Sequence, residues 1–257
     1  MLIGLLIAYI FLGGSHQTFL LNPNLEKNVS IYVKDKSRKE DIDKIIKQTI
    51  KSEDIFQKKI EKPACKKLED LNMNHLSTQS RFNKEYASLY DSLENLQNSY
   101  LSSELKIRSL IHANEWDSII NKTLVQPSRE KVSNAIYGKN IKLHDQLAKA
   151  CNERITDSVN RKKAKSYVDT YFSKGNSLAK AFLDLNYKYL SAIRPYTATR
   201  SDFEKPGKEM IDLRKNYSEY LVDMRFKLMA ITPEKEWPGL AKELNNEFNY
   251  LGAGGTR

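Results

Sequence analysis

Glycine and proline are scarce in this 257-residue chain, with 10 and 7 occurrences, and cysteine and tryptophan occur only twice each. So few turn-forming residues disfavour a β-sandwich and favour long helices joined by short connections. The composition is not that of a disordered protein, because 14 tyrosines and 9 phenylalanines at helical spacing provide apolar surface for a core. We therefore expect an all-α protein, an elongated antiparallel bundle of long helices.

The chain also lacks the motifs of common catalytic and cofactor sites. None of the four histidines follows a glutamate by three residues, as in di-iron bundles, and the haem, zinc-finger and zinc-protease patterns are absent. The glycines form no nucleotide-binding loop, and no nucleophile elbow occurs. We expect no catalytic residue, no metal, no cofactor and no enzyme activity. An enzyme of unrecognised type remains a third hypothesis behind the two given below.

The two cysteines, Cys65 and Cys151, lie 86 residues apart. They could form a disulfide outside the cytoplasm, whereas free buried cysteine is equally ordinary. The sequence leaves both alternatives open.

The net charge of +10 is concentrated in the middle of the chain, where residues 128–200 hold 15 basic and 6 acidic residues. One interpretation is a contact surface for phosphates, anionic lipid headgroups or an acidic partner, and the alternative is an ordinary solvated helix face. Nucleic acid is an unlikely partner, because the interleaved tyrosines fall on the apolar seam more often than on the basic face. The candidate contact residues are Arg154, Arg161, Lys162, Lys163, Lys165 and Lys174.

Residues 2–12 form an uninterrupted apolar run, and a second apolar patch follows at residues 19–21. Eleven residues suit the core of a signal peptide, whereas counting through to Leu21 gives about twenty, enough to span a bilayer. Residues 1–21 are therefore interpreted as an uncleaved membrane anchor or a cleaved signal peptide, with a buried core helix as the third alternative. Either of the first two places the protein in the cell envelope, outside the cytoplasm.

The chain resembles itself when residues 78–122 are shifted by 121 positions onto residues 199–243, and nine of the 45 pairs are identical. A duplication would give two related helical hairpins, whereas two amphipathic helices of similar composition are the alternative. The identical pairs are Thr78/Thr199, Ser80/Ser201, Phe82/Phe203, Lys84/Lys205, Asp91/Asp212, Asn95/Asn216, Lys106/Lys227, Glu115/Glu236 and Trp116/Trp237.

The only two tryptophans, Trp116 and Trp237, each follow a glutamate at the end of a heptad-patterned run. We expect both indoles to have a structural role, packing a helix end onto the bundle, and the alternative is an exposed pair that stacks on a ligand. The run before Trp116 has the seam spacing of helices that pack at a shallow angle. Its apolar positions are Phe82, Tyr86, Leu89, Leu93, Leu96, Tyr100, Ile107 and Leu110.

The expected organisation divides the rest of the chain into a linker, two helical units and a tail. Residues 22–36 are a linker in which Val29–Val33 has the alternation of a short strand or extended chain. Residues 37–127 form the first unit, in which a helix opened by Ser37 and Glu40 is interrupted at Pro63. Residues 128–250 form the second unit, and residues 251–257 a flexible tail.

The sequence thus predicts an exported or membrane-anchored helical-bundle protein, a non-enzymatic binding or structural component of the cell envelope. Its partner would be another envelope protein, and no oligomeric state is assigned. The second hypothesis is a bundle that binds an anionic ligand or membrane surface through residues 149–174.

Overall fold

The computed structural model describes residues 23–124 and 128–251, and within these ranges every regular element is helical. The prediction of an all-α protein is therefore confirmed. The predicted anchor or signal segment at residues 1–21 and the glycine-rich end of the predicted tail lie outside the described residues. The elements are α2 (Pro23–Tyr32), α3 (Lys36–Phe56), a π-helical turn (Gln57–Glu61), α4 (Lys62–Met73), α5 (Gln79–Leu110), α6 (Ala113–Thr123), α7 (Arg129–Arg154), α8 (Ser158–Ala192), α9 (Arg200–Met229), a 3-10 turn (Glu234–Glu236) and α10 (Trp237–Leu251).

Several helices begin at a side chain that accepts a backbone N–H of the first turn, which would otherwise lack a partner. The Asp35 carboxylate accepts from the N–H of Arg38, and the Asp157 carboxylate accepts from the N–H of Asn160, each at 2.7 Å. Helix α9 begins with a capping box formed by Thr199 and Asp202. The predicted start of α3 at Ser37 is therefore slightly late, because Asp35 caps the helix.

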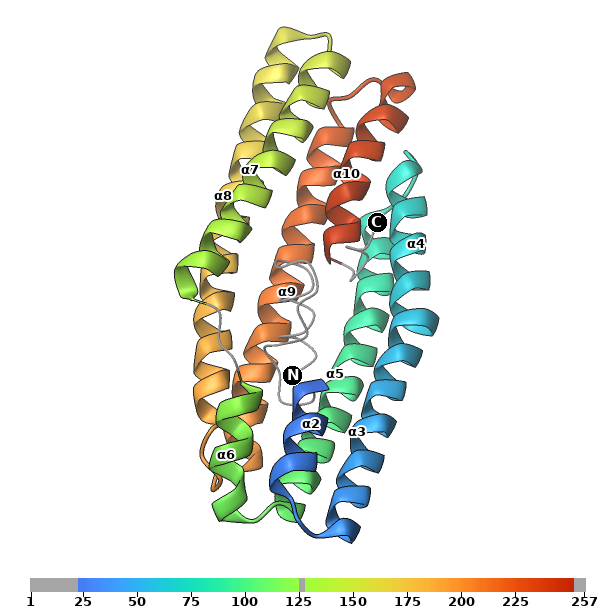
Figure 1. Ribbon diagram of the computed structural model, residues 1–257. Helices are drawn as coiled ribbons and strands as arrows, with labels where there is room; N and C mark the ends of the chain where they lie inside the picture. Colours follow the sequence, from blue (N-terminus) through green and yellow to red (C-terminus); the bar gives the residue numbers. More distant parts are fainter. Residues whose placement is uncertain (1–22, 125–127, 252–257) are drawn as a thin grey trace.

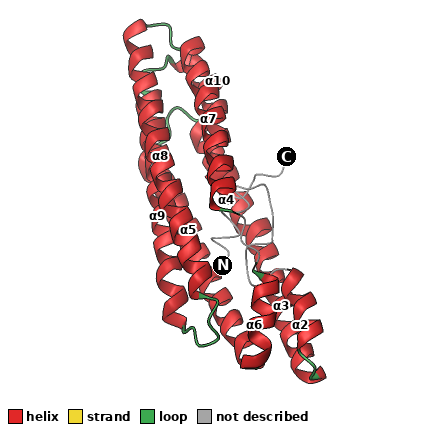
Figure 2. Ribbon diagram, turned by 60° about the vertical axis from the view of Figure 1, so that its left-hand side comes forward, coloured by secondary structure: helices red, strands yellow, loops and turns green. Residues whose placement is uncertain are grey.

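The long helices lie side by side along one axis, with α5 and α9 in contact at the centre (Figure 1). Helix α3 packs on α5, α8 packs on α9, and α7 covers α8. The short helices close the assembly, since α6 packs on α2 and α10 packs on both α4 and α7. Figure 2 shows the same long, narrow arrangement from another side.

The apolar seams predicted from the sequence are largely buried. In α5, the seam residues from Phe82 to Ile107 are buried, and Leu110 is half-buried. In α9, Phe203, Met210 and Met224 are buried, whereas Tyr217 is half-buried. Residues 78–122 and 199–243 have the same kind of backbone, a long helix followed by a turn and a shorter helix.

The interpretation of Val29–Val33 as a strand or extended chain is wrong, because these residues belong to helix α2 and its end. The N–H of Val33 donates to the carbonyl of Val29 at 3.0 Å, a helical step. Leu25, Val29 and Val33 are completely buried at a spacing of four residues. The five-residue window fits both periods, and only the extension back to Leu25 distinguishes helix from strand.

The predicted interruption at Pro63 is also wrong, because the helix continues from α3 through the π-helical turn into α4. The N–H of Lys62 donates to the carbonyl of Gln57, a step of five residues instead of four. Proline lacks an N–H, and here it falls in the first turn after the wider step. The change in hydrogen-bond step accommodates Pro63 without ending the helix.

Candidate functional site

Trp116, at the start of α6, is completely buried and is fixed by two kinds of contact. Its indole N–H donates to the carbonyl of Arg194 at 2.7 Å. The guanidinium of Arg108 lies 4.2 Å from the centre of the ring, a cation–π distance. The indole therefore joins α6 to the turn after α8.

Arg108, near the end of α5, also fastens that turn. Its guanidinium donates to the carbonyls of Ile193 at 2.9 Å, of Tyr196 at 3.2 Å and of Pro195. These carbonyls follow α8, where a helix end lacks internal donors, so a buried cation satisfies them. Burial lowers the pKa of Arg108, an effect opposed by Glu104 at 3.6 Å.

Trp237, at the start of α10, is held in the same manner at the other end of the molecule. Its indole N–H donates to the carbonyl of Asn72 at 3.0 Å, and the guanidinium of Arg225 lies 5.0 Å from the ring centre. Arg225 also donates to the carbonyl of Asn74 at 2.9 Å and contacts the carbonyls of Leu71 and Asn72. Burial lowers the pKa of Arg225 to about 10.

Each of these two clusters also takes a phenylalanine from the other half of the chain. Arg108 lies 5.2 Å from the ring of Phe203, and Arg225 lies 5.2 Å from the ring of Phe82. Neither indole is at the surface, so an exposed stacking pair does not occur. The structural role of the tryptophans stays a prediction, and the clusters supply its physical basis.

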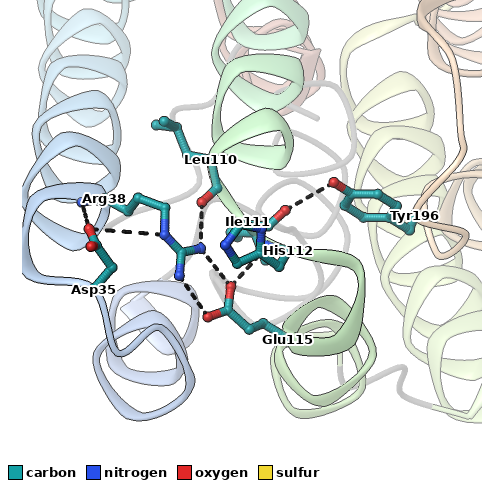
Figure 3. Close-up of polar contacts among 7 residues, drawn as sticks. All are labelled: Asp35, Arg38, Leu110, Ile111, His112, Glu115 and Tyr196. Carbon is teal, nitrogen blue, oxygen red and sulfur yellow. Dashed lines mark hydrogen bonds and ion pairs between the residues drawn. The ribbon is translucent and has the colours of Figure 1, made fainter.

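A half-buried ion pair fastens the beginning of α3 to the beginning of α6 (Figure 3). The guanidinium of Arg38 donates to both carboxylate oxygens of Glu115, at 2.8 and 3.0 Å, and to the carbonyl of Leu110 at 3.0 Å. Glu115 also accepts from the backbone N–H of His112 at 2.9 Å. The hydrogen bond from Arg38 is the main reason that the pKa of Glu115 is lowered.

Glu236 holds the corresponding place before Trp237, and its nearest cation is Arg154, at 3.8 Å. Arg154 also lies over Gly239, where an added Cβ atom would come within 2.0 Å of the guanidinium. This predicted anion contact is therefore half-buried between α7 and α10 and belongs to the fold.

The remaining predicted contact residues separate into one cluster and one outlier. The cluster comprises Arg161, Lys162, Lys163 and Lys165, all exposed in the first two turns of α8. Lys174 lies further along α8, where its ammonium is 4.3 Å from the centre of the Tyr220 ring of α9. Only the cluster of four therefore forms a continuous basic surface.

Both cysteines are free and buried, so the alternative of a Cys65–Cys151 disulfide is not realised. Cys65 lies in α4 and Cys151 in α7. Burial raises the pKa of each thiol to about 12, which disfavours the reactive thiolate.

Buried charge is the feature that sequence reasoning missed. Besides Arg108 and Arg225, the buried core holds Arg214, whose guanidinium is 3.7 Å from the carboxylate of Glu61. The Tyr90 hydroxyl donates to the Arg214 carbonyl at 3.0 Å. In the sequence, a buried arginine could be recognised only by its place beside an apolar seam position. Exposed arginines occur at such places too, so this feature does not identify the buried ones.

One further ion pair lies between the two central helices. The Lys215 ammonium donates to a carboxylate oxygen of Glu94 at 2.7 Å, and the two residues are 121 positions apart. That separation equals the shift of the internal similarity, so each residue contacts the residue that is its own counterpart.

Within residues 23–124 and 128–251, no helix is long and apolar enough to cross a membrane. In the same ranges, no group of three or more His, Cys, Asp and Glu side chains is arranged to hold a metal ion. Comparison with protein-family models, with curated proteins and with solved structures found no match for the chain.

Proposed function

We propose that this protein is a non-enzymatic binding protein of the cell envelope, built from two related helical units, and that one end of it is its contact surface. The observation that carries the proposal is a difference in charge between matched positions of the two units. The buried guanidinium groups of Arg108 and Arg225 are engaged with backbone carbonyls, so we assign these two charges a structural role.

Matched buried positions support the two related units beyond the nine identities. After the π-helical turn, buried residues pair at a separation of 121 positions. These pairs include Tyr90/Ile211, Tyr100/Leu221, Leu101/Val222, Ile107/Leu228 and Ile119/Leu240. Before that turn, the separation is 122 positions. The earlier pairs are Leu25/Leu147, Val29/Cys151, Val33/Ile155, Ile42/Ala164 and Ile46/Val168.

The change from 122 to 121 positions has a structural explanation in the π-helical turn. A step of five residues contains one more residue than the α-helical step of four. The π-helical turn at Gln57–Glu61 therefore accommodates one more residue than the matching part of α8, which is α-helical throughout. On this proposal the units are α2 to α6, and the second half of α7 to α10, in place of residues 37–127 and 128–250.

The surfaces at the two ends of the molecule differ where the units match. One end of the molecule carries Arg81 on α5 and the α8 cluster of Arg161, Lys162, Lys163 and Lys165. We call this end, with these five residues, the basic end. Their counterparts at the opposite end are Asp202, Lys39, Glu40, Asp41 and Asp43. Four of the five counterparts are acidic, and only Lys39, the counterpart of Arg161, is basic. The fold is thus compatible with acidic residues at four of these positions, so packing does not require Arg81, Lys162, Lys163 and Lys165 to be basic. Binding of an anionic partner would explain them.

The basic end is a single region, because α10 connects its parts. The end of α4 contacts the beginning of α10 through the Asn72–Trp237 hydrogen bond, and the end of α7 contacts the 3-10 turn directly before α10 through the Arg154–Glu236 ion pair. Helix α5 starts directly after the α4–α5 turn, and α8 starts directly after α7. The first turns of α5 and α8, which carry Arg81 and the α8 cluster, therefore both lie toward the end of the molecule where α10 begins, and the helices can be followed in Figure 1.

Retention on an immobilised sulfated polymer tests this function. We expect the full chain to elute at a salt concentration that falls sharply when Arg161, Lys162, Lys163 and Lys165 are changed to Glu, since screened charge drives such binding. The control changes four exposed lysines of α3 and the π-helical turn to Glu, with the same change in net charge. Equal elution of the two variants would contradict a localised site. The control residues are Lys44, Lys47, Lys51 and Lys59.

A further inference from the structure

The basic end carries two exposed apolar side chains whose matched positions at the opposite end are polar. Leu76, in the α4–α5 turn, is 82% exposed, and Val159, in the first turn of α8, is 58% exposed. Their counterparts are Thr197 and Ser37. Both apolar residues thus lie at the end where the matched positions are also more basic.

The turn that presents Leu76 is held in a fixed shape. The side-chain oxygen of Asn74 accepts from the N–H of Leu76 at 2.9 Å, and the N–H of Ser77 donates to the Asn74 carbonyl at 3.1 Å. The same Asn74 carbonyl accepts from Arg225 at 2.9 Å, so the turn is tied to the buried Trp237 cluster. These hydrogen bonds therefore fix the turn in a conformation that exposes the Leu76 side chain to solvent.

Basic side chains lie near both apolar residues along the chain. Lys162 and Lys163 follow Val159 by three and four residues, a spacing that places them beside it on the helix surface. Arg81 lies in the first turn of α5, five residues after Leu76. It lines a groove between α4 and α5 that contains both basic and acidic side chains, Lys67, Lys84, Asp70 and Glu85.

We infer that the basic end docks on the surface of an anionic lipid bilayer, with Leu76 and Val159 entering the boundary between headgroups and acyl chains. This inference rests on the proposed function and names its partner. Interfacial binding combines buried apolar area with attraction of Lys and Arg to anionic headgroups. A soluble polyanion would account for the charges but would leave both apolar tips in water.

The test measures the affinity of the full chain for vesicles of phosphatidylcholine alone and for vesicles in which about a third of the lipid is phosphatidylserine. The ratio of the two affinities isolates the basic end, because insertion of the apolar residues 2–12 does not depend on lipid charge. We expect the native chain to prefer anionic vesicles by about a hundredfold or more, and the four α8 changes to Glu to bring the ratio close to one. The α3 control variant should keep the preference.

The apolar contribution is tested with Leu76→Ser and Val159→Ser. Each change should weaken binding to anionic vesicles about tenfold and leave elution from the sulfated polymer unchanged, since the polymer offers no apolar layer. Polymer binding without a preference for anionic vesicles would overturn the lipid inference and keep the proposed function. If the α8 changes to Glu reduced neither polymer binding nor the preference for anionic vesicles, both the proposed function and the lipid inference would be overturned. A vesicle preference that neither Ser variant changes would show that charge alone accounts for the binding, and would overturn the inference that Leu76 and Val159 enter the bilayer.

Discussion

The buried arginines give the two tryptophans more than apolar contact. Each indole donates one hydrogen bond to a backbone carbonyl and lies under a guanidinium that binds further carbonyls. A single side chain thus links the start of one helix to the end of another. At this scale a few buried side chains satisfy helix ends that lack internal partners.

Trp116→Ala and Trp237→Ala should each destabilise the fold by about 3 to 5 kcal/mol, the usual cost of truncating a buried aromatic residue. Such a loss is a large part of the roughly 5 to 15 kcal/mol that stabilises a domain. Chemical denaturation measures the change, and the two losses should be similar. Trp→Phe at the same positions is the control, since it removes the N–H but keeps most of the ring. An unchanged melting temperature with lost partner binding would make the tryptophans a recognition site.

His144 makes the α7–α8 contact sensitive to pH. Its ring nitrogens lie 2.8 Å from Asp169 on α8 and 3.0 Å from Asp145. Burial opposes the charged form, but the hydrogen bonds to the two carboxylates outweigh it, so the pKa of His144 is raised. The stabilisation is therefore complete below about pH 6.5, the unfolded value, and is lost as the pH rises through the folded pKa.

The expected difference in unfolding free energy between pH 6 and pH 8 is less than about 1 kcal/mol, because the pair is partly exposed. His144→Gln should abolish that difference, and NMR titration of the His144 ring should give a pKa above the ordinary value. A native chain whose pH dependence equals that of the variant would exclude this contribution.

At the scale of the helix, the π-helical turn implies that one residue can be deleted there without rotating the rest of the helix, which is not possible in an ordinary α-helix. In a Pro63→Ala background, deleting Lys59 should turn the five-residue step into an α-helical step and leave α3 and α4 facing the core as before. We expect a loss of about 1 kcal/mol or less, since the flanking contacts are kept.

The matched control deletes Lys180, an exposed residue of α8 with no π-helical turn to absorb the change. Every later residue of α8 then rotates by about 100°. Leu183, Tyr189 and Leu190 would leave the core, at a cost of about 1.5 to 3 kcal/mol for each side chain. Circular dichroism during urea denaturation compares both deletions, and equal losses would show that the π-helical turn absorbs nothing.

Helix existence and core positions were predictable where the apolar period runs for many residues. The seam of α5 is buried because a heptad pattern of four turns or more leaves one consistent face. The short α2 was mistaken for a strand, since Val29–Val33 alone fits both periods. The π-helical turn was not predictable, because it depends on a hydrogen-bond step that no side chain in Gln57–Glu61 specifies.

The candidate site was predictable only in part. Local density of charge was sufficient to select the cluster from Arg161 to Lys165, but not to separate it from Arg154, which pairs across space with Glu236. Leu76 and Val159 were missed, because exposure at a turn depends on how distant helices end. Contacts between residues far apart in sequence carry this information.

For the whole molecule, the cell-envelope location is a separate prediction. The apolar run at residues 2–12 should direct the protein to membranes or out of the cytoplasm. Deletion of residues 2–21 should therefore shift the protein to the soluble cytoplasmic fraction, as measured by fractionation and immunoblotting. The four changes to Glu in α8 are the control, since they should leave export unchanged. An unchanged distribution after the deletion would refute the prediction.

The Glu94–Lys215 pair has a consequence for how such a molecule could arise. In a dimer of two identical units, a position on the symmetry axis meets itself, so a glutamate would face a glutamate and a lysine would face a lysine. Opposite charges at that place require the two halves to be encoded separately. In a single chain that contains both units, the two matched positions can carry different residues. The proposed duplication would therefore have allowed an attractive Glu–Lys pair at a contact where a symmetric dimer has two like charges that repel.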